Sequence, residues 1–230
     1  MRVAELWRYP VKSFGGERLA RAEVRPDGIV GDRVVRVADI GSGETVSART
    51  RGGLVSLSAT LGDDGEPFVD GRHWRHGETH RRLQEVAPGT RLLRDDSAER
   101  FDILPLLVAT DGAVAAFGED GRRLRPNLVV GGVDGLDERA WEGAALTVGE
   151  VVIGLHSLRD RCIVTTFDPD TAEQRVDVLL GIRARFAGKL ALNAWVVRGG
   201  SIAVGDPVEL HAADGLGSRP PGEVLGRFVS

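Results

Sequence analysis

Residues 157–171 have the sequence SLRDRCIVTTFDPDT, which contains the only cysteine of the chain, Cys162. Arg161 precedes it, and a neighbouring guanidinium favours the thiolate form that binds metals or attacks electrophiles. Apolar and hydroxyl residues then alternate up to Asp168-Pro169-Asp170, a strong turn signal. The pattern predicts a strand that runs into a loop, with the thiol near the strand start. A lone cysteine is more often a small buried side chain, so the rest of the chain decides between these interpretations.

Composition favours a globular protein with many short strands. The chain has 230 residues, of which 42% are hydrophobic and 28% charged. Its 31 glycines favour turns and short strands over long helices. The net charge of -4 argues against a nucleic-acid-binding protein. The single cysteine excludes an intrachain disulfide and a cysteine cluster for iron–sulfur or structural zinc. No signal peptide or membrane-spanning run is recognisable, so we expect a cytoplasmic protein without a membrane partner.

The first half of the chain reads as a series of short strands. They are expected at residues 3–7, 19–25 and 45–50, with a hairpin turn at 63–67. A tight loop with proline and paired glycines carries Lys12 and Ser13, and an ammonium beside a hydroxyl is a plausible anion site. Arg33 opens a further strand, and Arg49 ends one. These turns and strand ends therefore supply several candidate anion ligands.

Three histidines, His73, His76 and His80, lie in the polar segment 71–82. Their spacing suggests zinc, but no cysteine or carboxylate stands at ligand spacing in an ordered element. The segment is therefore expected to be a solvated loop.

The second half combines apolar strands with short helices. The apolar run 100–108 predicts a buried strand, and Thr110 or Asp111 can cap a helix at 113–119, whose N-terminus could bind an anion. Arg125-Pro126-Asn127 leads into another apolar strand. Further elements are expected as a helical turn at 137–141, a hairpin at 146–155, a helix at 179–187, a strand at 190–197 and a final hairpin at 201–210. The composition changes faintly near residue 100.

Five segments, in this order, resemble the MOSC family, which is named for the C-terminal domain of molybdenum cofactor sulfurase. The segments are Trp7–Ser13, Gly31–Arg33, Arg125–Val130, the parts of Arg161–Thr171 around Arg161-Cys162 and Thr165-Thr166, and Gly200–Val208. The resemblance covers most of residues 1–211 and points to the mitochondrial amidoxime-reducing component and its bacterial relatives. It implies a mainly β fold, with a β-barrel MOSC core, an N-terminal β-barrel or strand module and a few short peripheral helices. The expected divisions are 1–105, 106–212 and a flexible tail at 213–230.

The resemblance also implies a molybdenum cofactor, whose metal is held by the dithiolene of molybdopterin and one protein thiolate. By match of motif, Cys162 is the metal ligand and the catalytic residue. The implied cofactor-binding residues are Lys12, Ser13, Arg33, Arg49, Thr110, Arg125, Asn127 and Arg161. Asp111 departs from the family pattern, because it places an acid where a phosphate should be welcome. The residues agree with the implied site, since it needs one soft ligand and several anion donors.

The activity implied by the resemblance is reduction of N-hydroxylated or otherwise N-oxygenated small molecules. The chain shows no iron–sulfur domain, so the electrons are expected to come from a separate partner protein. Three alternatives stay open: a non-catalytic molybdopterin-binding or sulfur-carrying protein, a cysteine hydrolase that uses Cys162 with His156, and a plain β-barrel with an inert cysteine. Asp168 is a candidate general acid, although the turn also explains it.

Overall fold

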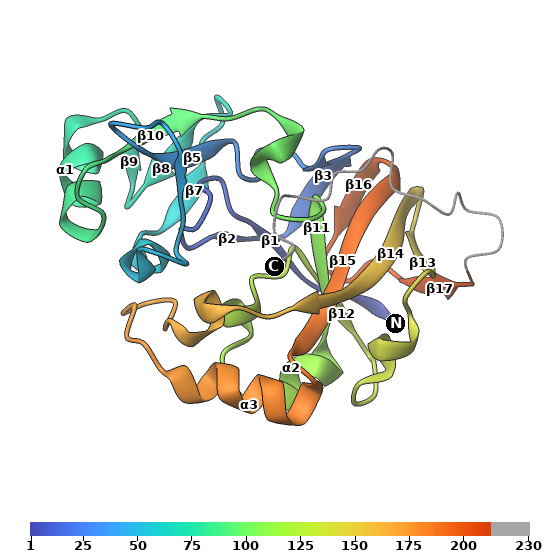
Figure 1. Ribbon diagram of the computed structural model, residues 1–230. Helices are drawn as coiled ribbons and strands as arrows, with labels where there is room; N and C mark the ends of the chain where they lie inside the picture. Colours follow the sequence, from blue (N-terminus) through green and yellow to red (C-terminus); the bar gives the residue numbers. More distant parts are fainter. Residues whose placement is uncertain (213–230) are drawn as a thin grey trace.

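The computed structural model describes residues 1–212, which form a mainly β fold with three short α-helices in that range (Figure 1). The largest sheet of the described chain has eight strands in the order β17-β13-β14-β15-β11-β12-β1-β2. Strands β11 and β12 are parallel, and the other neighbours in this sheet are antiparallel. The strands are β1 (Arg2–Arg8), β2 (Glu17–Leu19), β11 (Leu106–Thr110), β12 (Leu128–Gly131), β13 (Ala145–Val148), β14 (Val151–Asp160), β15 (Lys189–Arg198) and β17 (Glu209–His211).

Three smaller sheets and the helices surround this sheet. The smaller sheets contain β3 (Arg21–Arg25), β4 (Gly28–Ile29) and β16 (Gly200–Ala203); β5 (Val35–Asp39), β6 (Thr45–Val46) and β10 (Thr90–Arg94); and β7 (Ala59–Leu61), β8 (Pro67–Val69) and β9 (Arg72–His73). The α-helices are α1 (Gly77–Val86), α2 (Asp111–Phe117) and α3 (Val176–Phe186), and the 3-10 turns are η1 (Gly52–Ser56), η2 (Ala98–Arg100), η3 (Gly121–Leu124), η4 (Asp137–Ala140) and η5 (Ile163–Thr166).

Two main hydrophobic cores hold these elements together. One lies against the large sheet and joins Val3 and Leu6 of β1 to Leu192 and Val196 of β15. The other is built from residues between 11 and 87, with Phe14 fully buried in it. Because β1 pairs with β12, the start of the chain belongs to the large sheet and not to the second core. The division expected at residue 105 stays a prediction, and the tail expected at 213–230 lies outside the described residues.

Most of the expected elements are confirmed. The mainly β class with few short helices is found, and β1, the β7–β8 and β13–β14 hairpins, β15, α2 and α3 lie where the patterns predict them. Thr110 caps α2, since its hydroxyl accepts a hydrogen bond from the Ala113 amide at 3.1 Å.

The prediction of a solvated loop at residues 71–82 is wrong, because helix α1 begins at Gly77. The imidazole Nδ1 of His76 caps this helix by accepting from the Glu78 amide at 3.2 Å. Arg81 then pairs with both Glu78 and Glu85 along one face, and such i,i+3 and i,i+4 ion pairs stabilise a surface helix. Among residues 1–212 no group of three or more His, Cys, Asp or Glu side chains could hold a metal ion.

The prediction of a strand after Cys162 is wrong, because residues Ile163–Thr166 form the 3-10 turn η5. The hydroxyl of Thr165 donates to the Cys162 carbonyl at 2.8 Å, and that of Thr166 donates to the Ile163 carbonyl at 2.7 Å. Two consecutive threonines that bond back three residues stabilise a tight turn, although β-branched residues usually favour strands. The cysteine therefore follows strand β14 and does not begin a strand.

Two more expectations need correction. The strand predicted at 100–108 begins only at Leu106, because Pro105 and the preceding residues form a loop. The final hairpin is absent from the described chain: β16 pairs with β3, whereas β17 pairs with β13. Both partners lie far away in the sequence, so local alternation could not reveal them.

Candidate functional site

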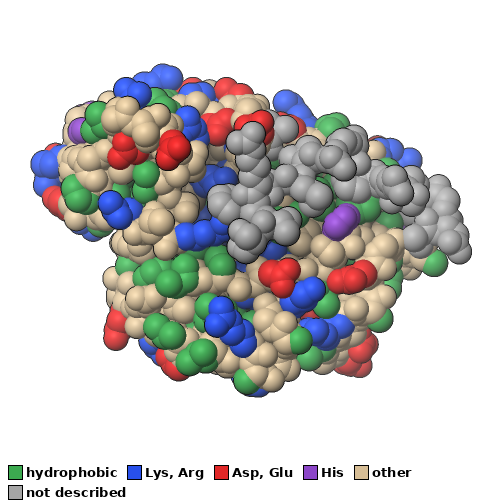
Figure 2. Space-filling model, in the orientation of Figure 1, with side chains coloured by type: hydrophobic (Ala, Val, Ile, Leu, Met, Phe, Trp, Pro, Cys, Tyr) green, Lys and Arg blue, Asp and Glu red, His purple; other side chains and the backbone are tan. Residues whose placement is uncertain are grey.

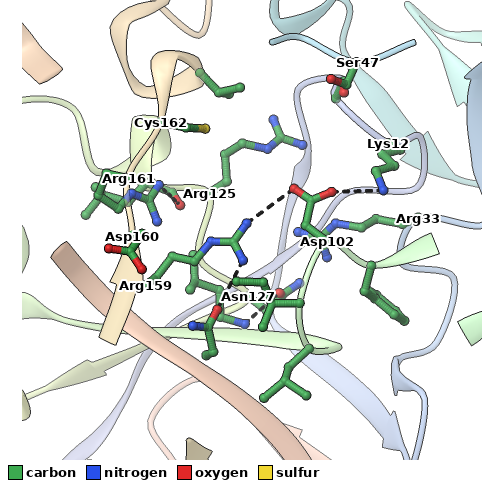
Figure 3. A pocket seen from close by; sticks show the side chains of 18 of the residues that line it. Lys12, Arg33, Ser47, Asp102, Arg125, Asn127, Arg159, Asp160, Arg161 and Cys162 are labelled. Atoms are coloured by element: carbon green, nitrogen blue, oxygen red, sulfur yellow. Dashed lines mark hydrogen bonds and ion pairs between the residues drawn. The ribbon is translucent and has the colours of Figure 1, made fainter. Parts of the chain in front are cut away.

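A cavity lies where the turns of the first half of the chain meet the end of strand β14 (Figure 3). It has a volume of about 100 Å³ and is partly open to solvent. Arg161 and Cys162 enter from one side, and Lys12 and Arg33 enter from the other. Of the sequence-predicted site residues, the cavity brings together Lys12, Ser13, Arg33, Arg49, Arg125, Asn127, Arg161 and Cys162. We call it the cationic cavity.

The lining carries a large excess of positive charge. Six cationic side chains face two carboxylates, those of Asp102 and Asp160; the cations are Lys12, Arg33, Arg49, Arg125, Arg159 and Arg161. Even when Asp32 is counted, which pairs with Arg33 from behind the wall, an excess of three positive charges remains. Lys and Arg side chains are also visible in the hollow between the two parts of the molecule (Figure 2). Such a concentration of like charge favours an anionic ligand.

Asp102 holds three of these cations in place. Its carboxylate lies 3.0 Å from Lys12 Nζ, 3.1 Å from Arg49 Nη2 and 3.3 Å from Arg159 Nη2. Burial alone would raise the pKa of Asp102, but these positive charges outweigh it and hold the pKa well below its usual range. The group is therefore ionised at neutral pH and acts as the anchor of the cation cluster.

The Asp102→Asn variant is expected to lose about 1–2 kcal/mol of unfolding free energy at neutral pH, because three cations lose their counter-charge in a half-buried site. A carboxylate whose folded pKa is depressed stabilises the protein above its unfolded pKa of about 3.9 and stops doing so as the pH falls. Urea titrations at neutral and acidic pH should therefore show the difference between wild type and variant shrinking in acid. Asp96→Asn, at an exposed ion pair with Arg94, is the matched control, and a difference independent of pH would contradict the prediction.

Three residues of the cavity wall adopt left-handed backbone conformations without being glycine. The φ angles are +75° for Ser13, +55° for Arg33 and +56° for Arg125. Such conformations cost about 1–3 kcal/mol each and persist where the surrounding structure imposes them, typically at functional sites. In this chain they turn the backbone so that the hydroxyl and the two guanidinium groups line one cavity.

Two buried guanidinium nitrogens of this wall have no hydrogen-bond partner among residues 1–212: Arg125 Nη2 and Arg161 Nε. One other nitrogen of each group is anchored, since Arg125 Nη1 donates to the Phe14 carbonyl at 2.7 Å and Arg161 Nη2 to the Leu124 carbonyl at 2.8 Å. Burial lowers the pKa of both groups, with a further contribution from the charge of Arg159 at Arg161. Unpaired buried donors cost free energy, and a bound anion would remove this cost.

The thiol of Cys162 is half-buried at the cavity wall. Its backbone carbonyl accepts from both the amide and the hydroxyl of Thr165, at 3.1 and 2.8 Å. Arg123 fixes the rest of this turn, because its guanidinium donates to the Thr166 carbonyl at 3.1 Å and pairs with Asp168. The turn thus fixes the backbone position of the sole thiol beside a group of cations.

Tyr9 lies behind the cavity, is 2% exposed, and has Arg125 4.3 Å above its ring. It is the only tyrosine in the chain. Burial raises the pKa of Tyr9 to about 12. We therefore expect a spectrophotometric titration to show no tyrosinate near pH 10 in the folded protein.

Since the unfolded chain releases this proton first, the free energy of unfolding should fall by ~2–3 kcal/mol between about pH 10 and pH 12. A Tyr9→Phe variant is the control and should lack this phenol-linked decrease. Ionisation near pH 10 while circular dichroism still reports the folded state would contradict the prediction.

The structure does not bring Thr110 to the cavity. Its hydroxyl caps α2 and lies 3.3 Å from the buried carboxylate of Glu138, and a cofactor contact at Thr110 stays a prediction. Asp111, the departure from the family pattern, accepts hydrogen bonds from the Gly132 and Val133 amides, at 2.7 and 3.1 Å. Its carboxylate therefore holds a loop in place.

Two further candidates lie elsewhere. Asp168 accepts hydrogen bonds from the Thr171 and Asp170 amides, which lower its pKa, so it is poorly suited to donate a proton. His156 is exposed, bonds to the Ser157 hydroxyl at 2.8 Å, and does not line the cavity that contains Cys162. The arrangement gives no support to a cysteine hydrolase.

Sequence reasoning missed Asp102, Arg159 and Asn193, which all line the cavity. Arg159 could have been found, because it lies two positions before Arg161 and side chains two apart share a face of a strand. Asp102 could also have been found, because it is a charged residue within an apolar run. Asn193 accepts from Arg159 at 3.3 Å, and nothing in its own strand indicates this contact.

Comparison with known proteins identifies two domains. The MOSC N-terminal beta barrel domain matches residues 1–75, and the MOSC domain matches residues 113–209. Among the described residues no helix is long and apolar enough to cross a membrane.

Two curated human proteins are similar in sequence. Mitochondrial amidoxime reducing component 2 of Homo sapiens is 31% identical over 126 residues, covering 46% of this chain and 37% of that protein. Mitochondrial amidoxime-reducing component 1 of Homo sapiens is 26% identical over an alignment of 280 residues, covering 90% of this chain and 82% of that protein. The chain thus spans little more than a third of the first relative and most of the second.

Solved structures show distant similarity. The YUAD protein from Bacillus subtilis matches with a TM-score of 0.47 and 17% identity, covering 92% of this chain and 95% of that one. YiiM from Escherichia coli matches with a TM-score of 0.45 and 12% identity, covering 92% and 70%. The two family models match successive parts of the chain, and the five sequence segments described above resemble the same family. The chain belongs to the MOSC family, with a MOSC N-terminal beta barrel domain ahead of the MOSC domain.

Proposed function

We propose that the cationic cavity binds a molybdenum cofactor and that the protein reduces N-hydroxylated or otherwise N-oxygenated small molecules. The observation that carries the proposal is the meeting of the sole thiol, Cys162, with six cationic side chains in one cavity. A pterin dithiolene with a phosphate matches this set, because it needs one soft protein ligand for the metal and several donors for its anionic end.

The donor set fits such a group in two respects. The unpartnered nitrogens of Arg125 and Arg161 offer hydrogen bonds that no group in the described part of the chain accepts. The described residues also offer no cluster of protein ligands around Cys162, so a metal bound there would take its other ligands from the cofactor. Because the cavity is small and partly open to solvent, the cofactor would extend beyond it.

The roles proposed for the residues follow from their positions. Cys162 would ligate the metal, and Lys12, Ser13, Arg33, Arg125 and Arg161 would hold the anionic parts of the cofactor, with Arg49 beside them. Asn127 lines the cavity and would also hold its wall in place. Its side-chain amide accepts from the Leu107 amide at 3.1 Å and donates to the Trp7 carbonyl and to Asp32 at 3.3 and 3.2 Å. Asp102 keeps Lys12 and Arg159 in position.

When bound, the cofactor supplies a two-electron redox change. The substrate N–O bond breaks, two electrons and two protons are consumed, and an amine or amidine and one water are released. The chain's contribution is to place the cofactor and to tune it through Cys162 and the hydrogen bonds around it. Apolar residues of the lining, among them Phe101, Leu106 and Val164, would limit water at the reacting centre.

The electrons would come from a separate partner protein, and a cytoplasmic location stays a prediction. The test uses protein purified from a host that makes molybdenum cofactor. Molybdenum and pterin should be equimolar with the chain, and benzamidoxime should be reduced to benzamidine when a chemically reduced viologen is the donor. NADH alone should give no turnover.

The same measurements separate the alternatives. Absence of both metal and pterin, from a host shown to load a related protein, would contradict the proposal. Bound molybdenum that no N-oxygenated substrate reoxidises would favour the cofactor-binding or sulfur-carrying alternative. Turnover with NADH and no second protein would contradict the need for a partner.

A further inference from the structure

A second cavity lies beside the cationic cavity, and the two share Arg125 and Val164 in their walls. Its volume is about 160 Å³. It is formed where the loop after β1 and the turn η1 meet the segment that follows Cys162. Its lining includes Trp7, Tyr9, Ser58, Arg123, Arg125 and Phe167. None of the proposed metal chemistry uses this cavity.

The size and walls of the second cavity suit one planar ring. A cavity of about 150 Å³ lined by apolar side chains is large enough for benzene. Trp7, Tyr9 and Phe167 provide aromatic walls, and aromatic pairs prefer offset or edge-to-face arrangements. Two glycines allow these rings to lie where they do: a Cβ on Gly16 would approach the Tyr9 ring to 2.5 Å, and one on Gly52 would approach the Phe167 ring to 2.3 Å.

Two guanidinium groups in the wall of the second cavity also have a buried nitrogen without an acceptor among the described residues. Arg123 is only 5% exposed, and its Nε has no partner in the described part of the chain. Its two terminal nitrogens already donate, to the Thr165 and Thr166 carbonyls and to Asp168. Arg125, which lies in both cavity walls, also has a nitrogen, Nη2, without a partner among the described residues. Leaving a buried donor unsatisfied costs about 1–3 kcal/mol, more when the group is charged.

The charges select the kind of acceptor. Arg122, at this cavity, already pairs with Asp120 and Asp170, and Arg123 pairs with Asp168. Arg125 bonds to the Phe14 carbonyl and to no carboxylate among the described residues. A single carboxylate would therefore complete the set, and hydrogen bonds between ionised groups are about twice as strong as neutral ones.

We propose that the second cavity binds a small aromatic carboxylate, with its ring between Trp7, Tyr9 and Phe167 and its carboxylate at Arg123 and Arg125. The site adjoins the proposed cofactor site and shares Arg125 with it, and its occupation does not depend on a metal. Because Arg125 lies in both walls, a ligand here would change the electrostatic environment of the cationic cavity.

The test is a titration of the ¹⁵N-labelled full chain with benzoate, followed by NMR of the four tryptophan indoles. The Trp7 signal is identified by its absence in Trp7→Phe. We expect a saturable shift of the Trp7 indole, with little change at Trp74, Trp141 and Trp195. Benzyl alcohol, which lacks the charge, and cyclohexanecarboxylate, which lacks the planar ring, should each bind at least about tenfold more weakly.

Two variants locate the site without altering the arginines. Ser58 is exposed at the second cavity, whereas Thr60 is exposed on strand β7 and does not line it. Ser58→Phe should weaken benzoate binding by at least about tenfold, and Thr60→Phe should leave it within about twofold. The proposal is overturned if the Trp7 indole shows no saturable shift up to about 10 mM benzoate, if benzyl alcohol binds equally well, or if Ser58→Phe binds like the wild type. Failure of these tests leaves the metal and pterin measurements unaffected, so the two proposals fail separately.

Discussion

The Cys162→Ser variant is expected to lose its molybdenum and its N-reductive activity while keeping its fold. Serine is nearly the same size but is a hard, weakly acidic ligand, so the metal loses the only soft ligand that the chain offers. Mutation of a residue that only hydrogen-bonds to a metal ligand already lowers metal affinity or activity by about 10–100-fold. We therefore expect activity to fall by more than about 100-fold, together with the ratio of molybdenum to chain.

The fold should survive because the thiol is half-buried and its turn is held by the Thr165 and Arg123 backbone contacts. Thermal unfolding should change by less than about 1 kcal/mol in unfolding free energy. Ile163→Ala, at an exposed neighbour outside the cavity lining, is the control and should retain metal. If the Cys162→Ser protein keeps the molybdenum-to-chain ratio of the wild type, Cys162 is not the metal ligand. Retention of pterin without metal would show that the arginines bind the organic part by themselves.

The Asp32→Ala variant is expected to cause the largest loss of stability, about 3–5 kcal/mol of unfolding free energy. Asp32 is fully buried, accepts from the Tyr9 amide at 2.7 Å and from Asn127 at 3.2 Å, and pairs with Arg33. Its removal leaves a buried amide and a mostly buried guanidinium without their acceptor. Urea denaturation and thermal melts should show this directly.

Asp32→Asn keeps the shape and removes the charge, so it should lie between wild type and alanine and provides a measurement if the alanine variant does not fold. Asp63→Ala, at an exposed turn, should change stability by no more than about 0.5 kcal/mol. If Asp32→Ala loses less than about 1 kcal/mol of unfolding free energy, water must replace the hydrogen bonds that the Asp32 carboxylate accepts, and the prediction is wrong.

The cavity residues found from sequence share one property: each belongs to a short segment with its own chemical signal. Lys12 and Ser13 lie in a proline–glycine loop, and Arg161 adjoins the sole cysteine. The left-handed backbone at Ser13, Arg33 and Arg125 could not be predicted, because these are not the glycines that usually adopt it. The surrounding structure imposes this conformation, and it cannot be predicted from the backbone preferences of serine and arginine.

The strands were predicted better than their partners. The segments expected at 146–155 and 190–197 overlap β14 and β15. The pairing of β16 with β3 and of β1 with β12 joins segments far apart in sequence. Thr110 caps α2, as its position before a helix predicts. Its hydroxyl also lies 3.3 Å from the Glu138 carboxylate, a contact that the local sequence does not indicate, and its cofactor-binding role stays a prediction.

Strand β1 pairs with β12 across a separation of more than a hundred residues. At a translation rate of about 5–20 residues per second, β1 would leave the ribosome roughly 6–25 s before its neighbour is synthesised. Val3 and Leu6, which are fully buried in the finished protein, stay exposed for that interval, whereas the core between residues 11 and 87 can already form. A slowly elongating ribosome lengthens this exposure, and binding by a chaperone that recognises short apolar segments would shield it during synthesis.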